Sequence, residues 1–84
     1  VEVHYRGMLT DGKTFDSSYD RGQAARFPVG GVIAGWTEAL QLMKEGGKWQ
    51  VLIPAELAYG ATPPGNTIPP NSPLFFEIEL ISVL

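Results

Sequence analysis

The chain has 84 residues, of which 44% are hydrophobic and 18% charged, with a formal net charge of −3 and no cysteine. A chain of this length closes a single hydrophobic core, and its composition excludes an intrinsically disordered segment as well as disulfides, thiolate metal sites and a cysteine nucleophile. The few basic residues are scattered, which argues against nucleic-acid binding, and no apolar run reaches the roughly 20 residues of a membrane span, so we expect one soluble domain without membrane insertion.

The N-terminal part of the chain predicts three strands. Residues 1–6 alternate between apolar and polar side chains, as in a strand with one buried face. Asp11-Gly12 then lies between two extended stretches, which indicates a hairpin turn into a second strand near Phe15. Residues 16–25 are polar and predict a loop or irregular edge. A short strand is expected over residues 27–29, where a proline confines it to the edge of a sheet.

The middle of the chain predicts one short helix. Trp36, Ala39, Leu40 and Met43 recur at the spacing i, i+3, i+4 and i+7, which places them on one helical face. We expect the helix to start near Gly35 and to end before the pair of glycines that follows.

The remainder predicts two more strands and a long loop. Residues 48–53 alternate, with Trp49 among the side chains on the apolar face, and residues 74–84 alternate in the same way. Residues 61–73 carry five of the seven prolines, and a loop of that length in a small domain is usually functional. The order of elements predicts an α+β domain, in which a twisted antiparallel sheet wraps around the single helix.

The usual catalytic constellations are missing. His4 is the only histidine, and it falls on the polar side of the first strand, where we expect it to face solvent. Ser17 and Ser18 lie in no nucleophile motif, and no glycine-rich phosphate loop precedes the helix. Glu77 and Glu79 share a strand face, which predicts a solvent-facing pair rather than glycosidase chemistry. We therefore expect neither a metal nor a cofactor.

Aromatic residues remain as candidates for a site. Tyr5, Phe15, Trp36, Tyr59 and Phe76 each lie beside a strand end, a helix start or a loop. Any one of them could be an ordinary core residue. As a set, they predict an apolar pocket.

Four segments resemble a known family. They are V-H-Y-R-G-M-L-T-D-G-K-T-F-D-S-S, G-V-I-A-G-W, I-P-A-E-L-A-Y-G and I-P-P-N-S-P-L-F-F-E-I-E-L. In this order they resemble the FKBP family of peptidyl-prolyl cis-trans isomerases nearly end to end. G-W-T-E-A-L-Q-L-M is similar to its bacterial branch, which includes macrophage infectivity potentiator proteins. The resemblance implies an FKBP-like half-barrel around a short helix, with the active site between helix and sheet.

The resemblance also implies roles for individual residues. Tyr59 would offer its hydroxyl, Asp16 would lie at the rim, and the backbone N–H of Ile33 would bind a substrate carbonyl, which makes these three the catalytic set. Trp36 would form the pocket floor. The other substrate-binding residues would be Tyr5, Phe15, Val32, Phe76 and Ile68, the last leaning in from the proline-rich loop. The family commonly has a further aromatic residue where this chain has Ala25, which implies a pocket that is more open there.

The implied function is an enzyme that catalyses rotation about X-Pro bonds in flexible or unfolded proteins and so assists folding. Its partners would be proline-containing segments of client proteins, and the macrolides tacrolimus and rapamycin would inhibit it. A peptide-binding or chaperone module that turns over poorly stays open as an alternative. A purely structural β domain would not need Tyr59-Gly60 and the proline-rich loop.

The resemblance further implies how the chain is organised. Residues 1–84 would be one isomerase domain that lacks the family's usual N-terminal strand and any upstream region. The parent protein is expected to be a homodimer through a region absent here. Exported relatives favour the bacterial periplasm or cell envelope over the cytoplasm.

Overall fold

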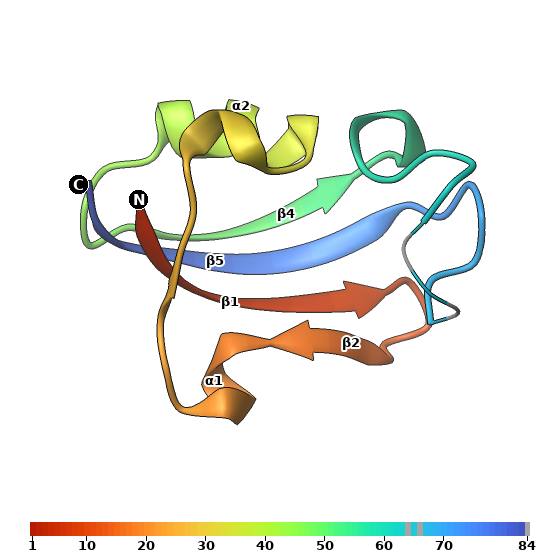
Figure 1. The fold of residues 1–84 in the computed structure, drawn as a ribbon, viewed down its shortest axis with the longest axis horizontal. Coiled ribbons are helices and arrows are strands. Elements are labelled where there is room, and N and C mark those ends of the chain that lie inside the picture. The colour runs from red at the N-terminus through yellow and green to blue at the C-terminus, as the bar shows by residue number, and fades with distance from the viewer. Residues whose placement is uncertain (64, 66, 84) are drawn as a thin grey trace.

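An open antiparallel sheet carries the fold in the computed structural model, which describes residues 1–63, 65 and 67–83. The strands follow the order β2-β1-β5-β4, and β3 also pairs with β1. Their bounds are Glu2–Leu9 for β1, Thr14–Ser17 for β2, Ala25–Arg26 for β3, Lys48–Ile53 for β4 and Leu74–Ser82 for β5. Helix α2, Ala34–Leu42, lies over one face of the sheet, and the single-turn helix α1, Ser18–Arg21, lies beside β2 (Figure 1). The predicted α+β class is confirmed.

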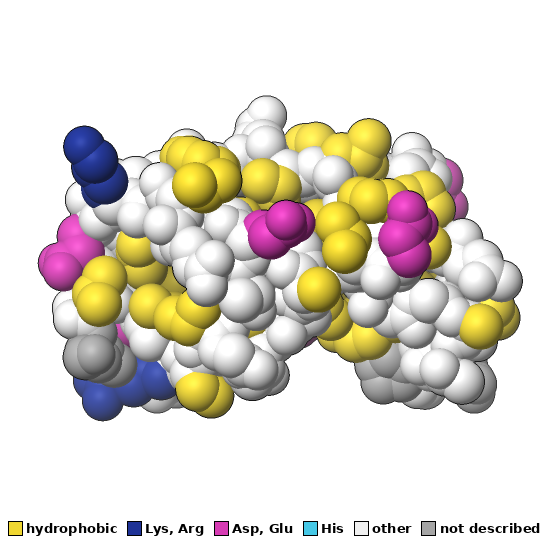
Figure 2. All heavy atoms as spheres, turned by 90° about the horizontal axis from the view of Figure 1, so that it is seen from above, with side chains coloured by type: hydrophobic (Ala, Val, Ile, Leu, Met, Phe, Trp, Pro, Cys, Tyr) yellow, Lys and Arg dark blue, Asp and Glu magenta, His cyan; other side chains and the backbone are white. Residues whose placement is uncertain are grey.

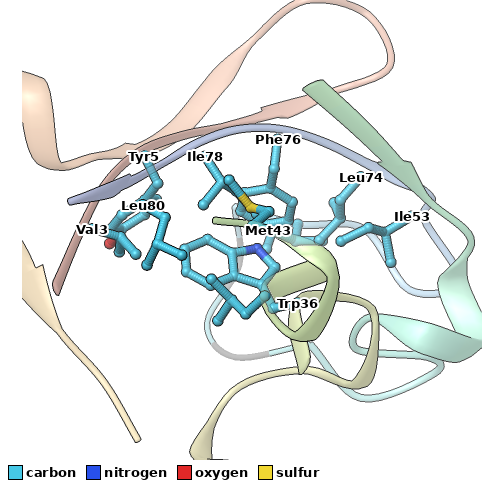
Figure 3. Close-up of a cluster of buried hydrophobic side chains, with 11 residues drawn as sticks. Val3, Tyr5, Trp36, Met43, Ile53, Leu74, Phe76, Ile78 and Leu80 are labelled. Atoms are coloured by element: carbon cyan, nitrogen blue, oxygen red, sulfur yellow. The ribbon is translucent and has the colours of Figure 1, made fainter. Parts of the chain in front are cut away.

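The two central strands supply most of the core. In their register Val3 lies opposite Leu80, and Tyr5 lies opposite Ile78. The side chains of Val3, Leu80 and Ile78 are almost fully buried, and they point toward α2 (Figure 3). The period-2 alternation that predicted these strands therefore also identified the buried face.

Helix α2 starts and ends close to its predicted bounds. No side chain caps its N-terminus, and the backbone carbonyl of Ile33 accepts the first hydrogen bonds of the helix. Gly35 brings the helix close to β4, because a Cβ at this position would lie 2.6 Å from Cγ2 of Ile53. Met43 follows the last helical residue and is still buried against the core.

The short strand predicted over residues 27–29 lies two residues earlier, in β3. Val29–Gly31 instead forms the 3-10 turn η1. Pro28 has no N–H for a strand ladder, and its φ of −69° leads into this turn. Phe27 nevertheless exchanges backbone hydrogen bonds of 2.8 and 3.0 Å with Val1, so the chain stays attached to the sheet up to the proline.

The stretch predicted as a loop, residues 16–25, contains α1. The Ser17 hydroxyl caps this turn by accepting from the Asp20 N–H at 3.3 Å. Gly22 ends it in the left-handed conformation with φ of 69°. Four helical residues are too few to show a periodic pattern, which is why only the capping residues signal this turn.

His4 does not simply face solvent as predicted. The ring is half-buried, its Nδ1 lies 2.9 Å from the Ser18 hydroxyl, and it stacks on Tyr19 with centroids 4.8 Å apart. The cause is α1, which covers this part of the outer sheet face. Glu77 and Glu79 lie on the same face and are half-buried too, with Glu79 accepting from the Tyr19 hydroxyl at 3.3 Å.

The proline-rich segment links the 3-10 turn η2, Ala55–Leu57, to β5. Its described residues, 61–63, 65 and 67–73, form no helix or strand, as predicted. The Asn71 N–H donates to the Gly60 carbonyl at 2.8 Å and so ties the end of the segment to its start. Pro64, one of the five predicted loop prolines, and Leu84, in the last predicted strand, lie outside the described residues.

Hydrophobic side chains reach the surface on the α2 side of the molecule, with acidic side chains among them (Figure 2). A groove of about 460 Å³ runs here between α2 and β4. Trp49 lines it and remains 37% exposed, because β4 is the last strand of the described sheet on this side. No helix among the described residues is long and apolar enough to cross a membrane.

Candidate active site

A second cavity, of about 430 Å³, lies between the start of α2 and the sheet. Most of its wall is aromatic or aliphatic. Its described lining residues are Tyr5, Phe15, Asp16, Phe27, Gly31, Val32, Ile33, Trp36, Tyr59 and Phe76. Asp16 is the only charged residue among them, so this is an apolar pocket with one carboxylate at its side.

Trp36 lines this pocket from the start of α2. Its indole is buried under side chains from β1 and β5 (Figure 3). Three rings meet it edge to face, with centroid distances of 5.1 Å for Tyr5, 5.7 Å for Phe27 and 5.3 Å for Phe76. Such pairs contribute about 0.5–1.5 kcal/mol each beyond burial of area, so they hold the indole in one orientation.

Gly7 on β1 makes room for two pocket walls. The rings of Phe15 and Phe76 pack edge to face with centroids 5.7 Å apart, directly over this residue. A Cβ at Gly7 would lie 2.6 Å from Cζ of Phe15 and 2.8 Å from Cε1 of Phe76. Any larger residue would therefore displace at least one wall.

The carboxylate at the side of the pocket is held by two partners. The Tyr5 hydroxyl donates to Oδ2 of Asp16 at 2.6 Å, and Nη1 of Arg21 donates to Oδ1 at 2.5 Å. Burial favours the neutral acid, but the two hydrogen bonds and the guanidinium charge outweigh it and hold the pKa of Asp16 below its ordinary value. Burial, together with the hydrogen bond to Asp16, raises the pKa of Tyr5.

Two residues that line the pocket each carry a donor for which no hydrogen bond to any of residues 1–63, 65 and 67–83 is found. One is the hydroxyl of Tyr59, which follows η2, and the other is the backbone N–H of Ile33, just before α2. Burial, and then the negative charge of Asp16, raise the pKa of Tyr59, so its hydroxyl stays protonated in neutral solution. Both groups are free to bind carbonyl oxygens of a ligand.

The pocket brings together most of the predicted site residues. All of the predicted catalytic and binding residues line it except Ile68, which lies in the hydrophobic core. The sequence prediction missed Phe27 and Gly31, which line the pocket, and Arg21, which donates a hydrogen bond to Asp16. Phe27 lines the pocket, whereas Ala25 does not. Phe27 lies two residues before the turn η1, and nothing in the sequence around it indicated that its side chain would reach the pocket.

The described residues offer no cluster of three or more His, Cys, Asp or Glu side chains that could hold a metal ion. The described residues that line the pocket supply aromatic surface, one carboxylate and two hydrogen-bond donors.

Comparison with known proteins assigns the chain to a family. Residues 1–81 match the family described as FKBP-type peptidyl-prolyl cis-trans isomerase. The chain belongs to this family, which confirms the resemblance found in the sequence.

Individual relatives agree. The chain is 58% identical over 82 residues to "Macrophage infectivity potentiator" of Trypanosoma cruzi, covering 98% of this chain and 42% of that protein. It is 58% identical over 84 residues to the FKBP-type 22 kDa peptidyl-prolyl cis-trans isomerase of Escherichia coli K12, covering 100% of this chain and 41% of the relative. The crystal structure of FkpA from Escherichia coli superposes with a TM-score of 0.90 at 52% identity, over 98% of this chain and 38% of FkpA. The chain thus spans about two fifths of the length of these two curated relatives.

Proposed function

We propose that this protein is a peptidyl-prolyl cis-trans isomerase that rotates X-Pro bonds in flexible or unfolded proteins. The observation that carries the proposal is the Trp36 floor, fixed by three edge-on rings beneath an apolar cavity. A proline ring is compact and largely apolar, and it fits against such a surface. Family membership supports the same reaction.

The reaction needs no nucleophile or metal, because no covalent bond forms or breaks. Amide resonance opposes rotation with a barrier of roughly 18–20 kcal/mol, and X-Pro bonds relax over tens to hundreds of seconds. The twisted amide has lost resonance and much of its charge separation. The apolar walls around Trp36 therefore disfavour the twisted amide less than they disfavour the planar one.

The polar groups of the pocket then orient the substrate. With the proline ring on Trp36, the Ile33 N–H binds one carbonyl oxygen and the Tyr59 hydroxyl binds another. Each hydrogen bond contributes on the order of 1 kcal/mol. The Asp16 carboxylate is an orienting acceptor rather than a proton donor, because its lowered pKa keeps it ionised. Phe15, Val32 and the other lining residues confine the proline, and Ile68 supports the walls from the core.

A peptide-binding module with poor turnover is the second candidate, because the same pocket could hold proline without lowering the barrier. A protease-coupled assay on a short X-Pro peptide separates the two. We expect the protein to accelerate cis-to-trans conversion, and tacrolimus to abolish this and change the fluorescence of Trp36, with Trp49 in the α2–β4 groove unaffected. Tacrolimus binding without acceleration would favour the binding module. If the protein neither binds tacrolimus nor accelerates the conversion, the pocket assignment is refuted.

We expect the variant Tyr59→Phe to lower kcat/KM by about tenfold at most, because it removes one hydrogen bond of ordinary strength and keeps the ring. The raised pKa keeps Tyr59 protonated, and the lowered pKa keeps Asp16 ionised, so the pH profile of the wild type should be flat between about pH 5.5 and 9. The variant should keep the same flat profile. Complete loss of activity in a folded Tyr59→Phe protein would show that Tyr59 acts as an acid.

The remaining expectations from the family resemblance stay predictions. They are the single isomerase domain over residues 1–84, a homodimeric parent protein, and a periplasmic or envelope location. Inhibition by rapamycin belongs with them.

A further inference from the structure

The segment that carries the Ile33 N–H leads from β3 into α2 (Figure 1). It passes through the turn η1, and three consecutive residues at its end, Gly31, Val32 and Ile33, line the pocket. The Ile33 N–H belongs to the peptide group that joins Val32 to Ile33. A peptide group is planar, so the backbone on both sides of the plane sets the direction of this N–H. The N–H keeps one direction only if the chain is fixed before the plane as well as after it.

The backbone of α2 fixes the chain after this plane. The N–H groups of Trp36 and Thr37 donate to the Ile33 carbonyl at 3.0 and 3.1 Å. That carbonyl belongs to the next peptide group, which joins Ile33 to Ala34. No side chain caps the start of α2, so no capping residue holds the chain before the plane.

Thr37 on α2 supplies the attachment before the plane. Its hydroxyl donates to the Val29 carbonyl at 2.7 Å. A threonine hydroxyl within a helix commonly binds the carbonyl four residues earlier, which here is that of Ile33. The Thr37 hydroxyl instead binds a carbonyl eight residues earlier, outside the helix. Among the residues that the structure describes, this is the only side-chain hydrogen bond between η1 and α2.

We propose that Thr37 is a positioning residue for the isomerase reaction. Its hydroxyl holds the Val29 carbonyl and its N–H holds the Ile33 carbonyl, so the N–H that binds the substrate lies between two fixed points. Thr37 is half-buried and does not line the pocket, and it therefore acts through Ile33 rather than on the substrate. This inference rests on the proposed function. The competing explanation is a local hydrogen bond that contributes to stability alone.

The test compares Thr37→Val and Thr37→Ser in the full chain. Valine keeps the shape and the branching of threonine but lacks the hydroxyl, whereas serine keeps the hydroxyl and lacks the methyl group. The matched control is Thr14→Val on β2, because Thr14 is exposed and its hydroxyl makes no hydrogen bond to another described residue. The measurements are kcat and KM on the X-Pro peptide, the melting temperature, and the order parameter of the Ile33 amide from NMR relaxation.

We expect Thr37→Val to raise KM by about three- to tenfold and to leave kcat within about twofold, because the Ile33 N–H binds the planar and the twisted substrate alike. The order parameter of the Ile33 amide should fall from about 0.85, typical of rigid backbone, toward the values below about 0.6 of flexible backbone. Thr37→Ser should stay close to the wild type in both quantities, because it keeps the hydrogen bond to Val29. Thr14→Val should change neither.

A Thr37→Val protein with a wild-type KM would overturn the positioning role and leave the isomerase assignment intact. An unchanged order parameter at Ile33 would also overturn it, even with a lower melting temperature, because the hydrogen bond would then contribute to stability alone. A Thr37→Ser protein as impaired as Thr37→Val would assign the effect to the methyl group and contradict the role of the hydroxyl. An inactive wild type would refute the proposed function and this inference together.

Discussion

Replacing Trp36 with leucine is expected to lower kcat/KM at least about tenfold and the free energy of unfolding by about 2–4 kcal/mol. In the proposed function the proline ring lies on the indole, and the indole also makes three edge-to-face contacts in the core. Leucine fills less of this space and gives the surrounding rings no fixed partner. Urea unfolding and the peptide assay measure the two effects.

Two further variants separate stability from catalysis. Trp36→Phe keeps an aromatic surface and removes the indole N–H, which is buried without a hydrogen-bond partner among the described residues. We expect it to retain more activity than Trp36→Leu. Trp49→Leu in the α2–β4 groove should leave activity unchanged. A Trp36→Leu protein as active as the wild type would contradict the role of the indole as the pocket floor.

Much of the fold could be predicted from local pattern alone. Strands β1 and β5 show strict alternation because one face of each is covered by the core, and α2 shows a helical stripe because it packs on that same core. Each of these signals comes from burial of one face of a single strand or helix. The sequence shows that face directly as a regular spacing of apolar residues. The start of α2 was less evident, because no side chain caps it.

The parts that were missed depend on contacts between elements. The turn α1 is too short to show a periodic pattern in the sequence. The contacts that His4 and Arg21 make depend on how α1 packs beside β1, which the sequence does not show. Phe27 reaches the pocket because Pro28 turns the chain after it. Ile68, which the family resemblance implies as a binding residue, packs in the hydrophobic core and is absent from the described lining residues, so its role stays a prediction.

The position of two pocket walls depends on Gly7, which has no side chain. Gly7 is expected to tolerate no substitution, and Gly7→Ala should lower kcat/KM by about 10- to 100-fold and stability by about 1–3 kcal/mol. The new Cβ would lie within 2.8 Å of both Phe15 and Phe76, so at least one ring must leave its place as a pocket wall. Kinetics on the X-Pro peptide and urea unfolding measure both losses.

Gly30→Ala is the matched control for this effect. A Cβ at Gly30 would meet no atom within 4 Å, so alanine there should change neither activity nor stability. The double variant Gly7→Ala with Phe15→Leu tests the cause, because a shorter side chain at Phe15 relieves part of the clash. We expect the stability losses of the two single variants to be less than additive in this double variant. Strictly additive losses, or a Gly7→Ala protein with unchanged kcat/KM, would mean that the two rings do not depend on the space above Gly7.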